Sequence, residues 1–394
     1  MNMRGVRACV WLSLLGAAAA AHGCGAGPSI DYGRYDQTSK PPSGPSLRVR
    51  WTKSLTPDLT GDYLPVEHAG AALDEQHQRV YVGSSERKLL ALATDGREHW
   101  TYRTESSIEA APTLDARADE LYVATASGHV HGLRASDGHV RFDVDLGASV
   151  SQVGVLSDDA LYLVTDSDGV FALSRKDGST LWRYQREPRA GLKITGHAGL
   201  LSTEQRLITG FSDGTVVALA KGDGRALWVV DTTLDLADSG QAEVGFVDVD
   251  TTPVQVGDTV YVASFVAGLY ALRAKDGSGL LHNAELTGVT SLAADERTIT
   301  LVSAEHGVVC YDLPTVTVRW SRQLGIRGAA NYVSLHDRML FVTESRGALL
   351  ALSIADGHEL GRLQTEHGFA TQPSVSGGQG AILGNAGIFY AFDY

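Results

Sequence analysis

The sequence predicts an all-β protein, an eight-bladed β-propeller of four-stranded antiparallel blades whose ring is closed by an N-terminal strand. Three observations lead to this prediction. An Asp-Gly turn recurs, mostly at intervals of 40–53 residues, two short apolar strands joined by a tight turn precede it, and no amphipathic helix pattern of useful length occurs. Units of about 40–45 residues with four strands are typical of propeller blades.

The outer turn of each unit carries the Asp-Gly pair. The Asp residues of these turns are Asp95, Asp137, Asp177, Asp223, Asp276 and Asp356. The last interval is 80 residues, twice the unit, and Thr315-Val316 stands at its middle, followed by Trp320. The fifth residue after each Asp is Trp100, Phe142, Trp182, Trp228, Leu281 or Gly361. We interpret the large apolar residues at this place as packing between blades rather than as a ligand cage.

The chain contains eight inner turns but only seven outer ones, because it stops at Tyr394. Gly, or the sequence Ser84–Arg87 in the first unit, supplies the positive φ that tight hairpins need. The missing outermost strand is expected from Leu47–Trp51, whose Trp51 matches Trp100. Closure by this N-terminal strand would remove two open sheet edges.

The first residues predict an export signal. Arg4 and Arg7 precede an apolar run from Ala8 to Ala21, which has the length of a signal peptide. The run ends in a sequence that resembles a bacterial lipobox with Cys24 as the lipidated residue, although His22 departs from the small residue usual there. The alternative is ordinary signal cleavage with Cys24 incidental.

Three parts of the chain follow from this assignment. Residues 1–23 are expected to be a signal peptide, 24–46 a lipid-anchored flexible tether, and 47–394 the propeller.

The formal net charge is −13, and removal of the signal takes away two arginines and no acid, which gives −15. With no basic block in the sequence, nucleic acid is not an expected partner. Only Cys310 would then remain unmodified, in the pattern of a buried strand, so no intramolecular disulfide is expected.

Three short motifs suggest chemistry, and we interpret each as structural. The sequence Gly210–Gly214 matches the G-x-S-x-G pattern around Ser212, but a strand follows where a nucleophile elbow needs a helix. Asp166–Gly169 resembles the start of a calcium loop without its later ligands. His129 and His131 lie on one face of a strand without a third ligand in sight, so surface histidines are expected rather than a metal site. No catalytic, metal-binding or cofactor-binding residue is assigned.

An insertion from Asp231 to Val247 interrupts the repeat before Asp248 and Asp250. Insertions in propellers extend loops on one face, where binding usually occurs. In an extended segment these two carboxylates point the same way. Two interpretations stay open: a pair of solvated or capping acids, or a charge pair for Arg or Lys of a partner.

The repeat as a whole resembles the quinoprotein-type propeller repeat over residues 47–394. Within that class, the lipobox, short tether and single ring resemble the BamB family of lipoproteins of the outer-membrane β-barrel assembly machine. The run Asp248–Val254 is similar to that family's own loop. The resemblance implies a non-catalytic scaffold, without cofactor, anchored to the outer membrane and facing the periplasm.

The same resemblance implies the partners and the docking residues. Its partners would be the barrel-forming subunit of the machine and unfolded outer-membrane protein clients. Docking would use Asp248 and Asp250 in one loop, and Leu192 and Ile194 in another, where Thr195 replaces the family's Arg. Two rival interpretations are a generic periplasmic interaction or sensor propeller and a quinone-dependent dehydrogenase, although the sequence lacks the adjacent cysteines of the latter.

Overall fold

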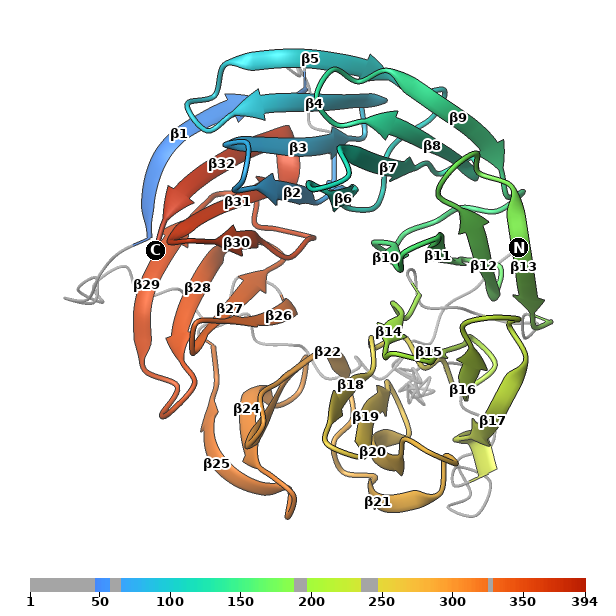
Figure 1. Cartoon of the computed structure of the whole chain (residues 1–394). Coiled ribbons are helices and arrows are strands. Elements are labelled where there is room, and N and C mark those ends of the chain that lie inside the picture. Colours follow the sequence, from blue (N-terminus) through green and yellow to red (C-terminus); the bar gives the residue numbers. More distant parts are fainter. Residues whose placement is uncertain (1–46, 57–64, 188–196, 235–246, 325–328) are drawn as a thin grey trace, which may run out of the picture.

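The computed structural model describes residues 47–56, 65–187, 197–234, 247–324 and 329–394. These residues form eight four-stranded antiparallel sheets that are arranged as blades around a central axis (Figure 1). The predicted fold is confirmed. Within the described part of the chain, no helix is long and apolar enough to cross a membrane.

The first four blades use consecutive strands, from the innermost to the outermost. Blade 1 contains β2 (Ala71–Asp74), β3 (Arg79–Ser84), β4 (Lys88–Ala93) and β5 (Glu98–Arg103); blade 2 contains β6 (Thr113–Asp115), β7 (Glu120–Ala124), β8 (His129–Arg134) and β9 (Val140–Asp145). Blade 3 contains β10 (Val155–Leu156), β11 (Ala160–Thr165), β12 (Gly169–Ser174) and β13 (Thr180–Gln185); blade 4 contains β14 (Leu201–Ser202), β15 (Arg206–Gly210), β16 (Thr215–Ala220) and β17 (Ala226–Asp231).

The next three blades follow the same order, and the eighth joins the two ends of the chain. Blade 5 contains β18 (Val254–Val256), β19 (Thr259–Ser264), β20 (Gly268–Arg273) and β21 (Gly279–Asn283); blade 6 contains β22 (Val289–Ala294), β23 (Thr298–Ser303), β24 (Gly307–Asp312) and β25 (Thr317–Arg322). Blade 7 contains β26 (Ala330–His336), β27 (Met339–Glu344), β28 (Ala348–Ser353) and β29 (Glu359–Gln364); blade 8 contains β30 (Ser374–Ser376), β31 (Gln379–Gly384), the 3-10 turn η1 (Asn385–Gly387), β32 (Ile388–Asp393) and β1 (Arg48–Ser54).

The ring closes through β1, as predicted. This strand pairs antiparallel with β32 and forms the outer edge of blade 8. Arg48 adds an ion pair to Asp393, with 2.6 Å between Nη2 and Oδ2. Because β1 comes from the start of the folded chain and β32 from its end, unfolding either end opens the ring.

The blades are joined by a contact that repeats around the ring. The indole Nε1 of Trp228 in β17 donates a hydrogen bond of 3.1 Å to Ala274 O in blade 5, and its ring covers Gly277 of the Asp-Gly turn there. A methyl group on Gly277 would lie 2.9 Å from ring atoms, and its φ of +74° favours glycine. Trp51, Trp100, Trp182 and Trp320 make the corresponding hydrogen bond to the next blade.

The exceptions to this pattern have physical reasons. Phe142 packs on Gly178 without a donor, and Leu281 packs against the same cluster as Val316, whose φ of +52° confirms that Thr315-Val316 forms an outer turn. Gly361 lies in β29 of blade 7, and the following blade 8 has no outer turn because its two outer strands come from opposite ends of the chain. There Tyr394 packs edge-on against Phe341, with 5.1 Å between ring centroids. The interpretation of the repeated aromatic position as packing between blades is therefore confirmed.

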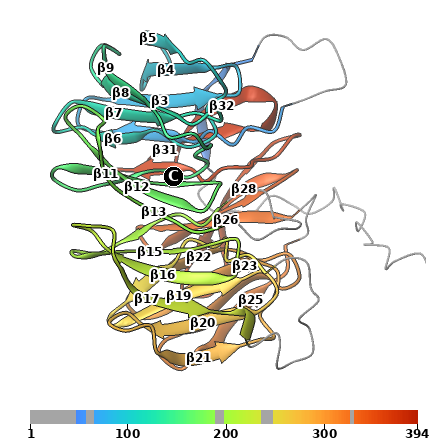
Figure 2. The same cartoon turned by 90° about the vertical axis from the view of Figure 1, so that its right-hand side faces the viewer.

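The strand order places the loops between strands on two opposite faces of the ring. Since neighbouring strands are antiparallel, the turn between the second and third strands of each blade lies on the same face as the connection to the next blade (Figure 2). The Asp-Gly turns lie on the opposite face. The connection between blades 3 and 4 and that between blades 4 and 5 therefore open on one face, beside the inner turn of blade 4.

The contact between Trp228 and the turn of blade 5 can be tested by truncation. We expect Trp228→Phe, which leaves Ala274 O without its donor, to lower the free energy of unfolding by about 1–2 kcal/mol. We expect Trp228→Ala to lower it by about 3–5 kcal/mol. Urea unfolding followed by circular dichroism measures both. Val318→Ala, at an exposed position of β25, is the control and should change stability by less than about 0.5 kcal/mol.

Candidate functional site

The two predicted docking segments lie in neighbouring connections between blades. Leu192 and Ile194 lie outside the described residues, and so does most of the insertion that precedes Asp248. The residues on either side of the first segment, and the segment that contains Asp248 and Asp250, are described. The site is therefore built from the places where these connections attach to the ring.

The chain from Val247 to Asp250 runs as an alternating segment. Val247 and Val249 are buried in the core between blades 4 and 5, and Asp248 and Asp250 alternate with them along the chain. Asp248 is nevertheless only 5% exposed. It is not the solvated acid that the sequence allowed.

Main-chain hydrogen bonds attach this segment to the inner turns of two blades. Val249 N–H donates to Phe211 O of blade 4 at 3.2 Å, and Phe265 N–H of blade 5 donates to Asp248 O at 3.4 Å. A methyl group on Gly210 would stand 2.2 Å from Val249 O. Blade 4 thus needs glycine there, because the acidic segment crosses directly over its inner turn.

Asp250 has a carboxyl group in an unusual environment. Its Oδ1 is buried and has no hydrogen-bond partner. Burial, with the nearby charge of Asp248, raises the pKa of Asp250 to about 7, and its own amide and His197 offset only part of this effect. Burial, together with the charge of Asp250, raises the pKa of the Tyr332 phenol in β26. Within the described residues the Asp250 carboxyl group forms no ion pair.

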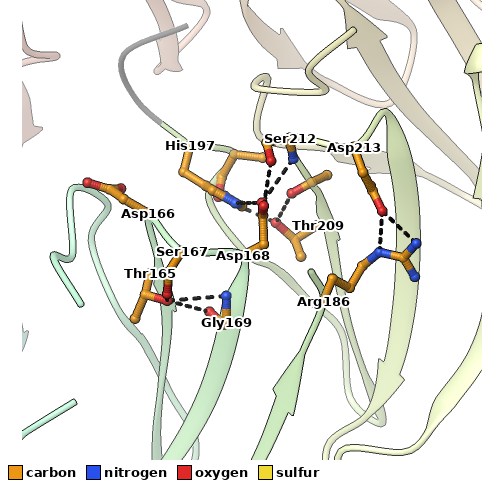
Figure 3. A network of polar contacts seen from close by, with 12 residues as sticks. Thr165, Asp166, Ser167, Asp168, Gly169, Arg186, His197, Thr209, Ser212 and Asp213 are labelled. Carbon is orange, nitrogen blue, oxygen red and sulfur yellow. Dashed lines mark hydrogen bonds and ion pairs between the residues drawn. The ribbon is translucent and has the colours of Figure 1, made fainter. Parts of the chain in front are cut away.

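The neighbouring connection is held by a buried polar network (Figure 3). Asp168, in the inner turn of blade 3, accepts hydrogen bonds from Ser212 N–H at 2.9 Å, from the Ser212 hydroxyl, and from His197 Nε2 at 2.9 Å. The side chain of Asp168 is fully buried, and these donors keep its pKa low despite the burial. His197 Nδ1 lies 3.2 Å from Ala198 O, so both ring nitrogens lie near oxygen atoms.

The other end of that connection is attached to the same turn of blade 4. Arg186 forms an ion pair with Asp213, with 2.6 Å between Nη2 and Oδ2 (Figure 3). Beyond His197, Gly199 N–H donates to the Thr252 hydroxyl at 2.9 Å. The structure therefore brings the flanks of both predicted docking segments together around the inner turn of blade 4.

The G-x-S-x-G match is an anchoring turn rather than a nucleophile elbow. Asp168 stands between Ser212 and His197, whereas a Ser-His-Asp triad requires the histidine to take the serine proton. The sequence did not identify Asp168, His197 or Arg186 as parts of this site. The only signal was that Ser212 and Asp168 occupy inner turns of adjacent blades.

The two histidines of β8 differ in environment. The expectation of surface histidines is wrong for His131, which is 2% exposed, with Nε2 at 2.9 Å from Glu105 Oε2 and Nδ1 at 3.1 Å from the Tyr102 hydroxyl. His129 is half-buried and lies 2.8 Å from Asp143 Oδ1. In the described ranges no group of three or more His, Cys, Asp or Glu is arranged to hold a metal ion.

Cys310 is completely buried in β24 and carries a free thiol. Burial raises the pKa of this thiol. It is therefore the inert core residue that the sequence predicted.

Comparison with known proteins identifies the family. The family model described as "Outer membrane protein assembly factor BamB" matches residues 116–322, more than half of the chain. The chain belongs to this family. An outer membrane protein assembly factor BamB from Shewanella oneidensis is 24% identical over 276 residues, which is 70% of this chain and 69% of the relative.

Solved structures share the fold. The crystal structure of BamB from Moraxella catarrhalis superposes with a TM-score of 0.72 at 20% identity and covers 88% of this chain and 100% of that chain. A quinohemoprotein alcohol dehydrogenase from Pseudomonas putida superposes with a TM-score of 0.63 at 12% identity, over 88% of this chain and 76% of the enzyme. At these identities the likeness describes the propeller, and the function must come from the site.

The environment of Asp250 predicts a pH-dependent stability. Because its pKa is about 7 when folded and near 3.8 when unfolded, the stabilisation is fully present below about pH 3.8 and is lost as the pH rises through 7. The full displacement corresponds to about 4 kcal/mol, and partial solvent access reduces it to about 2 kcal/mol. We expect Asp250→Asn to be more stable than wild type by that amount at pH 8, with a gain that shrinks towards pH 4.

Urea unfolding at pH 4, 6 and 8 measures this difference. The control is Asp258→Asn, which replaces an exposed acid in the turn between β18 and β19. An equal stability of the Asp250→Asn variant and wild type at pH 8 would contradict the assignment of a strained carboxylate.

Proposed function

We propose that the chain is a non-catalytic scaffold lipoprotein of the outer-membrane β-barrel assembly complex. In this role it docks on the barrel-forming subunit and assists the insertion of outer-membrane proteins. Membership of the BamB family supports the role. The single structural observation that carries the docking hypothesis is the Asp250 carboxyl group, which is held beside Asp248 with a buried oxygen that has no hydrogen-bond partner.

The chemistry of this pair favours a cationic partner. A buried carboxylate without a donor is costly, and a guanidinium or ammonium group that reaches it supplies both a charge and hydrogen bonds. Asp248 adds to the negative field at the same place. An Arg or Lys side chain of the barrel-forming subunit is therefore the group that we assign to this pair of acids, and Leu192 and Ile194 would add apolar contacts from the neighbouring connection.

The outer strands suggest how clients could be held. The outermost strand of each blade leaves one edge unpaired, and an extended peptide can add to such an edge by β-augmentation. On β17 the side chains of Leu227 and Val229 are 38% and 47% exposed, and within the strand Asp231 is the only charged residue. Strands of outer-membrane barrels carry alternating apolar residues, which match this edge.

Purification distinguishes this role from its rivals. The tagged protein would be isolated from outer membranes in mild detergent and its co-eluting proteins identified. A barrel-assembly subunit supports the scaffold. A bound quinone chromophore with dye-linked oxidation of alcohols would instead support a dehydrogenase on the same fold.

The docking residues are tested with amides rather than lysines, because Asp248 is almost fully buried. We expect the double variant Asp248→Asn/Asp250→Asn to bind the barrel-forming subunit at least about tenfold more weakly, since the cation loses its counter-charge. Co-purification after washing with increasing salt, with affinity by calorimetry, measures this. Asp250→Asn alone, which should not weaken folding at pH 8, is measured beside the double variant. Urea unfolding of both variants separates a loss of affinity from a loss of stability. Equal retention of the variant and wild type would show that these acids do not dock.

Residues 1–23 and 24–46 lie outside the described residues, and we assign them to a signal peptide and a lipid-anchored tether. The protein would then face the periplasm from the outer membrane through an acyl group on Cys24. We expect Cys24→Ser to leave the membrane fraction after a high-salt wash, which wild type should survive. Membrane fractionation with immunodetection measures this. A variant that stays with the outer membrane after washing would contradict lipidation at Cys24.

A further inference from the structure

The outer strand of blade 4, β17, differs from its counterparts at the residue that follows the repeated aromatic position. This residue is Val229, whose side chain is 47% exposed at the rim of the ring (Figure 1). The strand register shows that the equivalent residues of the other seven blades are all polar, namely Thr52, Thr101, Asp143, Arg183, His282, Ser321 and Arg362. Blade 4 alone has an aliphatic side chain there.

Cationic side chains protect most of the other edges. An outermost strand offers unpaired main-chain groups to any extended chain, and Lys or Arg on the strand opposes such pairing. In the described ring, six of the eight outer strands contain Arg or Lys, and β17 and β21 contain neither. β21 has five residues and begins at Gly279, whereas β17 has six residues and no glycine. β17 is therefore the longer of the two unprotected edges.

The two faces of β17 differ in what they contact. The ring of Trp228 covers Gly277 of blade 5, and Val230 Cγ2 would lie 3.1 Å from a methyl group on that glycine. Since side chains alternate along a strand, Leu227 and Val229 point the opposite way, where they are 38% and 47% exposed. One face of this edge is thus packed on the next blade, and the other is apolar and exposed.

The main chain of β17 has hydrogen-bonding groups on its open side. Thr232 N–H donates to Gly214 O at 3.0 Å, so the main-chain groups of Val230, two residues earlier, also point towards β16. Those of Val229 and Asp231 therefore point to the open edge. An added strand could exchange hydrogen bonds with them without disturbing the ladder between β16 and β17.

The chemistry of the edge selects the kind of strand that it fits. An added strand would place every second side chain beside Leu227 and Val229, where cross-strand packing favours apolar residues. Asp231, the only charged residue of β17, favours a basic residue at that end of the added strand. Strands of outer-membrane barrels alternate apolar and polar residues in this way. A second copy of the chain is a poorer occupant, because each copy carries a formal charge of −13.

We propose that the edge of β17 is the client-binding site, where one unfolded strand of an outer-membrane protein adds to blade 4 with its apolar side chains beside Leu227 and Val229. The inference rests on the proposed function, which supplies the client. The Thr232 hydroxyl at the end of β17 donates to Gly214 O in the inner turn of blade 4. The same turn holds Val249 of the proposed docking segment, so the client strand would end beside that segment.

The experiment uses the full mature chain and a synthetic peptide of about ten residues, the length of a barrel strand, in which Val alternates with Thr and one end carries Lys. A second peptide has the same composition with its valines contiguous. Amide hydrogen exchange followed by mass spectrometry locates the bound peptide. We expect the alternating peptide at saturation to slow exchange in residues 226–231 severalfold and to leave β25 unchanged. The second peptide should not slow it.

Two substitutions at Val229 test the edge itself. Val229→Pro removes an N–H that points outward, and Val229→Lys keeps that N–H and adds a charge. We expect each to weaken binding of the fluorescently labelled alternating peptide about tenfold or more, measured by anisotropy. Ser321→Pro and Ser321→Lys, at the equivalent exposed position of β25, are the matched controls and should leave the affinity unchanged. Thermal unfolding of all four variants checks that the ring is intact.

Equal affinity of the peptide for wild type, Val229→Pro and Val229→Lys overturns the inference, and so does protection that appears in another blade instead of β17. A wild-type dimer that Val229→Lys dissociates would assign the edge to a second copy and also overturns it. A barrel-assembly subunit that co-purifies with a protein unable to bind the peptide overturns the inference alone. A peptide bound at β17 without any co-purifying assembly subunit supports the strand-binding edge and overturns the proposed function.

Discussion

The contact between a tryptophan and the Asp-Gly turn of the following blade is the interaction on which the rest of the structure depends. The contact has two parts, a hydrogen bond from the indole N–H to a carbonyl oxygen and close packing of the indole ring over a glycine. Trp228 and the turn at Gly277 show both. Neither blade alone could bury that ring. Because five blades repeat the contact, the same packing geometry sets the distance between blades at each of these junctions. Since the ring is closed, a change in that distance at one junction must be compensated at the others.

A ring with fixed spacing determines where its loops can meet. The described parts of the connections on either side of blade 4 are attached to its inner turn. On one side Arg186 forms an ion pair with Asp213, and His197 is linked to Ser212 through Asp168. On the other side Val249 N–H donates to Phe211 O. A polar network of this kind is favourable only when its members are satisfied. Asp168, buried among its donors, meets this condition, and Asp250 close by does not.

The sequence predicted what is periodic and missed what is not. The period identified every blade, and the offset of Trp320 identified Thr315-Val316 as a turn without Asp-Gly, which the positive φ of Val316 confirms. The contacts of Asp168 with His197 and Ser212 span 29 and 44 residues, and Ser212 appeared in the sequence only as part of an enzyme motif. The near-complete burial of Asp248 was also missed, because alternation gives the direction of a side chain but not what covers it.

The carboxyl groups of Asp168 and Asp250 are in opposite situations, and comparing them explains how the fold tolerates the unpaired one, Asp250. Asp168 accepts three hydrogen bonds and ties two blades together, so its burial contributes to the fold. Asp250 is held by a segment that is hydrogen-bonded on either side of it, by the Val249 N–H to Phe211 O and by the Thr251 hydroxyl to Ala263 O, whereas its own Oδ1 has no partner. A rigid ring can maintain such a group because its geometry does not depend on it. In the docking that we propose, a cation of the partner would return the stability lost there, and this is the condition under which a buried, unpaired charge favours binding over folding.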